Sequence, residues 1–145
     1  MTQLELKQSD VNSVVTLFSS GHVLEALKAV KILSNNFPKD SLLHNITGAC
    51  HAGLGNLDLA LESYEKAIAI NPSYAKAYFN LGVAHHELGQ LINSIKSYER
   101  SIEIDPSVGY INPPTRYNNV DFPELFLPEI KTRSPALMWK LIPST

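Results

Sequence analysis

The stretch of sequence that decides the fold is residues 75–108, which read AKAYFNLGVAHHELGQLINSIKSYERSIEIDPSV. In its first half, one helical face is marked by side chains at the i, i+3, i+4, i+7 spacing: Tyr78, Leu81, Gly82, His85 and Leu88. Gly89 then supplies a residue that tolerates the left-handed conformation ending many helices. A second helix follows and must stop at Pro106, because proline has no N–H to donate. We expect the inner face of this second helix to carry Ile95, Tyr98, Ser101 and Ile102.

The same pattern recurs upstream with a period of 34 residues. Five columns keep this spacing over three copies: Pro38, Pro72 and Pro106; Gly21, Gly55 and Gly89; Ala26, Ala60 and Ser94; Val30, Tyr64 and Tyr98; Leu27, Leu61 and Ile95. The period predicts three units, about 7–40, 41–74 and 75–108, within residues 1–108. A single helical hairpin cannot bury both of its apolar faces, so such units stack into one continuous core.

Two glycines inside the expected helices indicate close packing. Gly48 and Gly82 cost about 1 kcal/mol each relative to alanine in a helix interior. This cost is explained if each glycine lets the paired helix approach closely, at Ala60 and Ser94 respectively.

The repeated residues resemble the tetratricopeptide repeat family over about residues 7–108. The third unit matches the family pattern at Tyr78, Leu81, Gly82, His85, Ser94, Tyr98 and Pro106, and the second at His44, Thr47, Gly48, His51, Ala60, Tyr64 and Pro72. The first unit is degenerate but keeps Ala26, Val30 and Pro38. The resemblance implies an all-α fold, a right-handed superhelix of antiparallel helix pairs forming an α-solenoid. It also implies protein–protein recognition as the usual role.

The resemblance further implies that the first helix of each pair lines the concave side of the solenoid. On that side we expect a peptide-binding surface made of Asn12, Val15, Asn45, Ile46, Lys76, Phe79, Asn80, Val83 and His86. The three asparagines are read as one column, whose amide donors and acceptors could hold the backbone of an extended peptide. The alternative is that the apolar members pack between neighbouring helices and that the asparagines have structural roles.

A related subfamily binds the acidic C-terminal tails of chaperones through a clamp of lysine, asparagine and arginine. The corresponding positions in the first two units are apolar here: Val11, Val15 and Ile46. Only Lys76 and Asn80 keep the clamp's chemistry. We therefore do not expect an adaptor for chaperone tails.

The composition narrows the remaining classes of function. With 44% hydrophobic and 18% charged residues the chain is a typical globular protein, and a net charge of −2 gives no reason to expect nucleic-acid binding. Cys50 is the single cysteine, so an intramolecular disulfide is excluded. The N-terminus does not look like a signal peptide, and no apolar run reaches the roughly 20 residues of a membrane span. We expect a cytoplasmic protein.

We find no pattern that predicts catalysis, a cofactor or a metal site. His51 and His85 occupy equivalent positions in adjacent units, but both fall on the expected packing face. No carboxylate or thiolate lies beside them at ligand spacing. The expected function is therefore that of a non-enzymatic adaptor or scaffold. It would bind an extended polypeptide, or its own or a neighbour's tail, in the concave groove.

Residues 109–145 form an irregular, proline-rich tail in this interpretation. Six prolines interrupt it, at positions 113, 114, 123, 128, 135 and 143, yet it is rich in apolar residues such as Phe122, Phe126 and Trp139. We expect Phe122–Pro128 to occupy an apolar groove of its own chain or of a neighbour. Docking on a neighbour would give self-association through residues 109–145. The alternative is that the tail begins a further domain. The repeats would then be an N-terminal accessory module of a larger enzyme, such as a bacterial transferase.

Overall fold

The computed structural model describes residues 5–108, which hold six α-helices and no strand. The helices are α1 (Gln8–Ser19), α2 (Val23–Asn36), α3 (Ser41–Gly53), α4 (Leu57–Ile70), α5 (Ala75–Glu87) and α6 (Leu91–Ile104). Each expected unit contains one helix pair. The second helices of the pairs begin at Val23, Leu57 and Leu91, which are 34 residues apart, the period found in the sequence.

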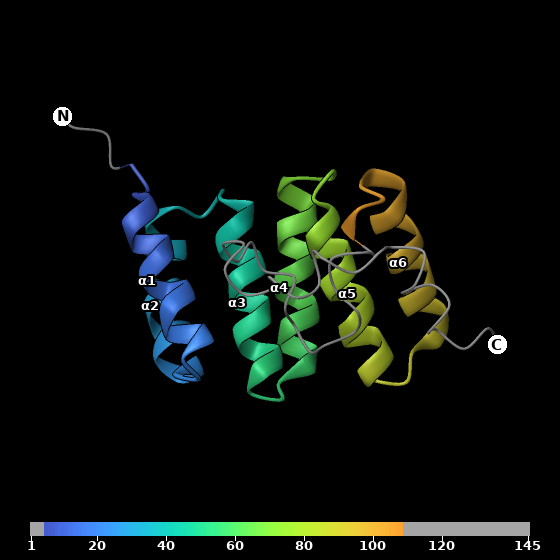
Figure 1. The fold of residues 1–145 in the computed structure, drawn as a ribbon, viewed down its shortest axis with the longest axis horizontal. Coiled ribbons are helices and arrows are strands. Elements are labelled where there is room, and N and C mark those ends of the chain that lie inside the picture. Colours follow the sequence, from blue (N-terminus) through green and yellow to red (C-terminus); the bar gives the residue numbers. More distant parts are fainter. Residues whose placement is uncertain (1–4, 109–145) are drawn as a thin grey trace, which may run out of the picture.

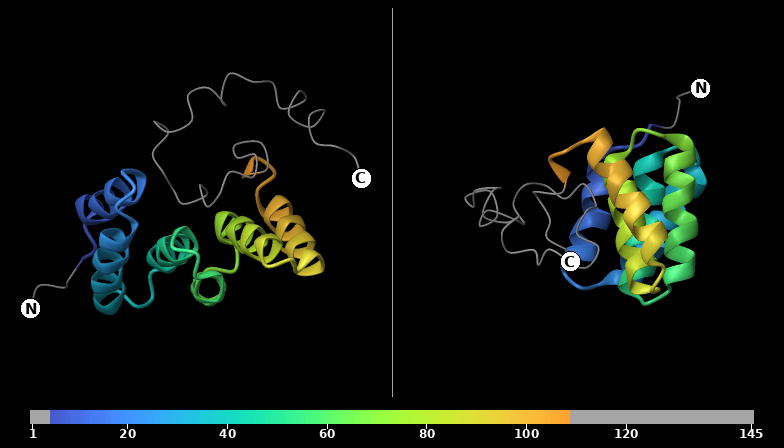
Figure 2. Two further views of the ribbon diagram at one scale, coloured as in Figure 1. Left: turned by 90° about the horizontal axis from the view of Figure 1, so that it is seen from below. Right: turned by 90° about the vertical axis from the view of Figure 1, so that its right-hand side faces the viewer.

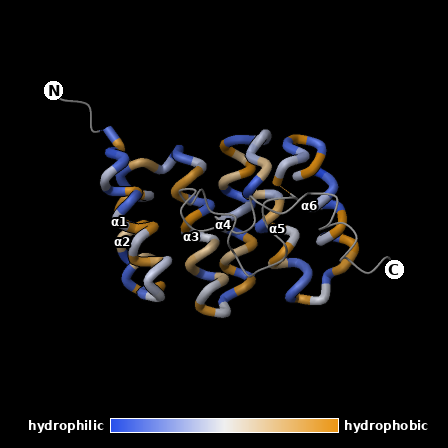
Figure 3. Tube along the Cα trace, viewed as in Figure 1, coloured by the Kyte–Doolittle hydropathy of each residue, from blue (hydrophilic) through white to orange (hydrophobic). Residues whose placement is uncertain are grey.

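The helices lie side by side in chain order (Figure 1). Each helix packs on the next one along the chain, and α3 also contacts α1 and α5. Seen from below, the helices follow an arc, with α1, α3 and α5 on its inner side and α2 and α4 on its outer side (Figure 2, left). Hydrophobic and hydrophilic residues alternate along every helix (Figure 3), as one buried and one exposed face require. The structure confirms the all-α solenoid.

Glycine turns and a side-chain cap mark the ends of several helices. Gly21, Gly55 and Gly89 have φ angles of 85°, 82° and 76°, the left-handed conformation that the sequence predicts for the turn within each pair. At the start of α3, the side chain of Asp40 accepts a hydrogen bond of 3.2 Å from the backbone N–H of Leu43.

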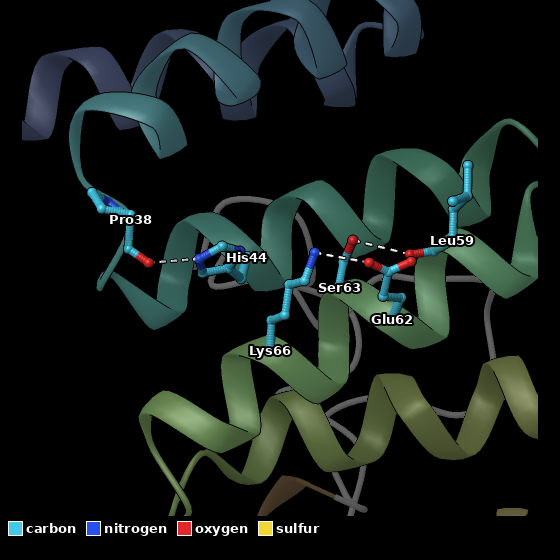
Figure 4. Close-up of polar contacts among 6 residues, drawn as sticks. All are labelled: Pro38, His44, Leu59, Glu62, Ser63 and Lys66. Carbon is cyan, nitrogen blue, oxygen red and sulfur yellow. Dashed lines mark hydrogen bonds and ion pairs between the residues drawn. The ribbon is translucent and has the colours of Figure 1, made fainter.

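One polar contact in Figure 4 lies at the connection between the first two repeats, and the others lie within α4. The His44 side chain donates through Nε2 to the carbonyl of Pro38 at 2.9 Å, which ties the linker to α3. On α4, Lys66 and Glu62 form an exposed ion pair of 2.8 Å. Exposed pairs of this kind contribute little to stability, so packing must hold the repeats together.

The core is built around the tyrosines that face the mid-helix glycines. Tyr64 is fully buried, and a Cβ added at Gly48 would lie 2.5 Å from its Cε1 atom. A Cβ at Gly82 would lie 2.8 Å from the ring of Tyr98. The glycines therefore make room for an aromatic ring of the paired helix.

The expected inner face of α6 is wrong at two positions. Ile95 and Ile102 are 56% and 38% exposed, whereas Ser94, Ser97 and Ser101 are buried. The small serines allow α6 to approach α5 closely. Two of them bond directly to its backbone: Ser94 Oγ donates to the carbonyl of Gly82 at 2.8 Å, and Ser101 Oγ to that of Ala75 at 2.7 Å.

The predicted tail, including the docking of Phe122–Pro128, lies outside the described residues. Among residues 5–108, no helix combines the length and the apolar character needed to cross a membrane.

Candidate peptide-binding surface

The candidate surface is the inner side of the arc, carried by α1, α3 and α5. Three of its nine expected residues are accessible. Asn12 on α1 and His86 at the end of α5 are exposed, and Lys76 in the first turn of α5 is half-buried. These three side chains offer an amide, an imidazole and an ammonium group, a set suited to hydrogen bonds with a peptide backbone and with its carboxylates.

The other six residues are buried, none of them more than 8% exposed: Val15, Asn45, Ile46, Phe79, Asn80 and Val83. Val15 and Ile46 belong to the hydrophobic cluster of the first two repeats, and Phe79 and Val83 to that of the last two. Each inner helix packs against the helices beside it, so its lateral side chains are buried between them. These apolar residues pack between helices, which is the alternative interpretation given by the sequence. Their contact with a peptide stays a prediction.

The three asparagines do not form one column. Asn80 Nδ2 donates to Asn45 Oδ1 at 3.0 Å, and Asn45 Nδ2 donates to the Tyr74 hydroxyl at 3.3 Å, so this pair links α3 to α5. Asn12 is exposed, and its Oδ1 accepts from Gln8 on its own helix. The cause lies in the period, which aligns Asn12 and Asn80 with Ile46 and leaves Asn45 one position out of register.

Aromatic contacts fix the α5 side of the surface. The rings of Phe79 and Tyr98 lie 5.3 Å apart between centroids, tilted by 55°. Burial raises the pKa of the Tyr98 hydroxyl, which a hydrogen bond with Ser94 partly offsets. The Arg100 guanidinium lies 6.0 Å from the centroid of the Tyr78 ring, at the outer limit of a cation–π contact. Phe79 is thus held by the second helix of its own repeat.

Neither Cys50 nor His51 has the surroundings of a reactive group. Burial raises the pKa of the Cys50 thiol to about 12, which keeps it protonated and unreactive. Burial also lowers the pKa of His51, an effect that Lys31 strengthens and Glu62 opposes. In the described part of the chain, no three His, Cys, Asp or Glu side chains gather as a metal site would require.

One further surface was expected from the sequence only as an apolar face left by the last unit, without its residues. Helix α6 exposes four large apolar residues, which we call the α6 apolar face: Leu91, Ile92, Ile95 and Ile102. The period could have revealed it. Three of these residues align with Leu57, Leu61 and Ile68 of α4, and no repeat follows α6 within the described residues to receive them.

Comparison with known families agrees with this geometry. A model described as "TPR repeat" matches residues 52–89, and a model described as "Tetratricopeptide repeat" matches residues 75–108. Residues 52–108 of the chain therefore carry tetratricopeptide repeats. Repeats of this family generally mediate protein–protein interaction, and their fold is typically a non-catalytic module. The degenerate first repeat lies outside the matched residues, although its helix pair is present in the structure.

Solved structures of other tetratricopeptide repeat proteins have the same fold. The first repeat domain of Spaghetti (RPAP3), bound to the HSP90 peptide SRMEEVD, is 25% identical with a TM-score of 0.66; the match covers 73% of this chain and 86% of that one. MamA is 24% identical with a TM-score of 0.65, and the match covers 69% of this chain and 58% of that of MamA. No curated protein sequence matches the chain.

Proposed function

We propose that this tetratricopeptide repeat chain is a non-enzymatic cytoplasmic adaptor that binds an extended segment of another protein on the inner side of its arc. The observation that carries the proposal is the alignment of α1, α3 and α5 on that side, where α3 contacts both of its neighbours. This alignment makes one continuous surface across the repeats. The peptide-bound structure of the RPAP3 repeat domain supports a peptide as the class of ligand.

Binding depends on the accessible residues of this surface, Lys76 and His86 above all. Lys76 is only partly exposed, and a hydrogen bond from its charged ammonium group to a peptide carbonyl or carboxylate is stronger than one between neutral groups. The buried members, such as Phe79 and Asn80, act by keeping α5 in place. Their replacement would disturb packing as well as binding, so they are poor sites for a test.

The test uses peptides selected from a random-sequence display library against the full chain. Their affinities are then measured by calorimetry for the full chain and for its Lys76→Ala and His86→Ala variants. The matched control is Lys66→Ala, which removes an exposed lysine from α4 on the outer side. We expect a loss of about tenfold or more for Lys76→Ala, the worth of one charged hydrogen bond, a smaller loss for His86→Ala, and none for the control. Selected peptides that respond to Lys66→Ala and to neither inner variant would contradict the proposal.

The acidic peptide SRMEEVD provides a second arm of the same experiment. Val15 and Ile46 are buried apolar residues where the chaperone clamp needs polar groups. We expect this peptide to bind with a Kd of about 1 mM or weaker. Tight binding would mean that the inner surface recognises carboxylates by another set of residues.

A further inference from the structure

The α6 apolar face has an equivalent on α4, one repeat earlier, and that equivalent packs against the following helix. Leu91 and Ile95 are 57% and 56% exposed, and Ile92 beside them is 72% exposed. Along α4, the residues aligned with Leu91, Ile95 and Ile102 are Leu57, Leu61 and Ile68, which are partly buried against the core cluster that includes α5. The α6 apolar face is therefore the surface that, one repeat earlier, receives the next segment of the chain.

The turn that follows α6 repeats the turn that follows α4. After α4, Asn71 Oδ1 accepts from the backbone N–H of Ser73 at 3.1 Å. After α6, Asp105 Oδ1 accepts from the backbone N–H of Ser107 at 3.0 Å. The first of these turns leads the chain into α5, which packs on α4. Val108, at the end of the second turn, is only 2% exposed, so the chain is anchored as it leaves the third repeat.

A second copy of the chain fits the α6 apolar face poorly. Beyond the inner surface, α1 exposes polar residues, among them Ser13 and Thr16. Head-to-tail stacking would bury these groups against isoleucines, which is unfavourable. Pairing of α6 with its own copy would use a helix of 14 residues. Such a helix is about 21 Å long and offers much less than the roughly 800 Å² per partner of a stable interface.

We propose that the α6 apolar face is covered by the chain's own segment Phe122–Leu127, FPELFL, in place of a fourth repeat. Four of its six residues are large and apolar: Phe122, Leu125, Phe126 and Leu127. Pro113 and Pro114 interrupt the stretch where a helix equivalent to α5 would stand, so a continuous helix is disfavoured there. The intervening residues 109–121 reach about 40 Å when extended, which exceeds the length of α6. The short tether gives the segment a local concentration in the millimolar range.

The single buried cysteine makes a clean test possible. Because the Cys50 thiol has a pKa of about 12, a thiol introduced by Ile92→Cys at the edge of the face reacts alone with a maleimide dye at neutral pH. The reference is Leu59→Cys, at a position of α4 that is 47% exposed. We expect the thiol of Ile92→Cys to react about tenfold more slowly than the reference, as for a covered state populated about nine-tenths of the time.

Tail substitutions in the full chain then identify what covers the face. Phe122→Ser with Phe126→Ser should bring the labelling rate of Ile92→Cys up to that of the reference. The matched pair Leu137→Ser with Met138→Ser should leave the rate slow. Circular dichroism checks that the repeats stay folded. Three outcomes would each overturn the proposal. In the first, Ile92→Cys is labelled fast although the tail is unsubstituted. In the second, the Leu137→Ser and Met138→Ser pair also raises the labelling rate, and in the third, the protection of Ile92→Cys increases with protein concentration.

Discussion

Gly48 and Gly82 occupy the same place in consecutive repeats, but the rings they face are not equally confined. Tyr64, which faces Gly48, is fully buried, whereas Tyr98, which faces Gly82, keeps part of its surface exposed. A methyl group at either position would overlap a ring. The Tyr98 ring can shift toward solvent to relieve the overlap, and the Tyr64 ring cannot.

We therefore predict that Gly48→Ala destabilises the chain more than Gly82→Ala. Overpacking costs about 1–3 kcal/mol, from which the higher helix propensity of alanine recovers about 1 kcal/mol. Urea denaturation should show a lower free energy of unfolding for Gly48→Ala and a change near zero for Gly82→Ala. Gly53→Ala, at the exposed end of α3, gives a milder case for comparison, because its added Cβ would lie 3.3 Å from Val23 Cγ1. Equal losses at both glycines would show that the two tyrosines are equally confined.

His51 makes the stability of the chain depend on pH. Its side chain is 7% exposed, and within the described structure its Nδ1 atom has no hydrogen-bond partner. Burial lowers the pKa of His51 below its ordinary value of 6.5 in the folded chain. The unfolded chain therefore binds a proton first as the pH falls, and folding loses stability below about pH 6.5.

We predict that His51→Phe reduces this loss. The free energy of unfolding, measured by urea denaturation between pH 7.5 and pH 5, should fall less steeply in the variant than in the parent chain. His86→Gln, at an exposed position of the next repeat, serves as the control and should keep the parent's slope. If the free energy of unfolding of His51→Phe falls with pH as steeply as that of the parent chain, the pH dependence comes from other groups.

At the scale of the element, α6 is joined to α5 through serines. Ser101 Oγ donates to the carbonyl of Ala75, whereas Ser97 Oγ donates to the carbonyl of Asn93 within α6 itself. We predict that Ser101→Ala lowers the free energy of unfolding by about 1 kcal/mol, the usual worth of a buried hydrogen bond. Ser97→Ala should be close to neutral. If thermal or urea denaturation shows equal losses of stability for Ser101→Ala and Ser97→Ala, the hydrogen bond from Ser101 to α5 stabilises the chain no more than the hydrogen bond of Ser97 within α6.

The same serines show why α6 was only partly predictable. The period, the glycine turns and the proline stops correctly placed six helices, because these depend on local backbone chemistry. Hydrophobicity then assigned Ile95 and Ile102 to the inner face. It failed because close approach to α5 selects small side chains such as Ser94. Apolar pattern alone does not distinguish a face that packs on the paired helix from one that receives the next unit.

At the scale of the molecule, the residues predicted for the inner surface differ in accessibility, and their contact with a peptide stays a prediction. His86 is exposed and Lys76 half-buried, whereas Phe79 and Val83 are buried. The asparagines were misread because Asn45 sits one residue out of the period. A one-residue offset turns a helical side chain by about 100°. That rotation decides whether a side chain meets a neighbouring helix or solvent.

The order of packing along the chain has a consequence for how the molecule melts. Almost every contact joins elements that are close in sequence, so each helix pair gains its stability from itself and from the units beside it. The middle pair, α3 and α4, has a neighbour on both sides, while within residues 5–108 α1 packs only on α2 and α3. Heating should therefore loosen α1 and α2 before the centre, and amide protons there should exchange at lower temperature than those of α3 and α4.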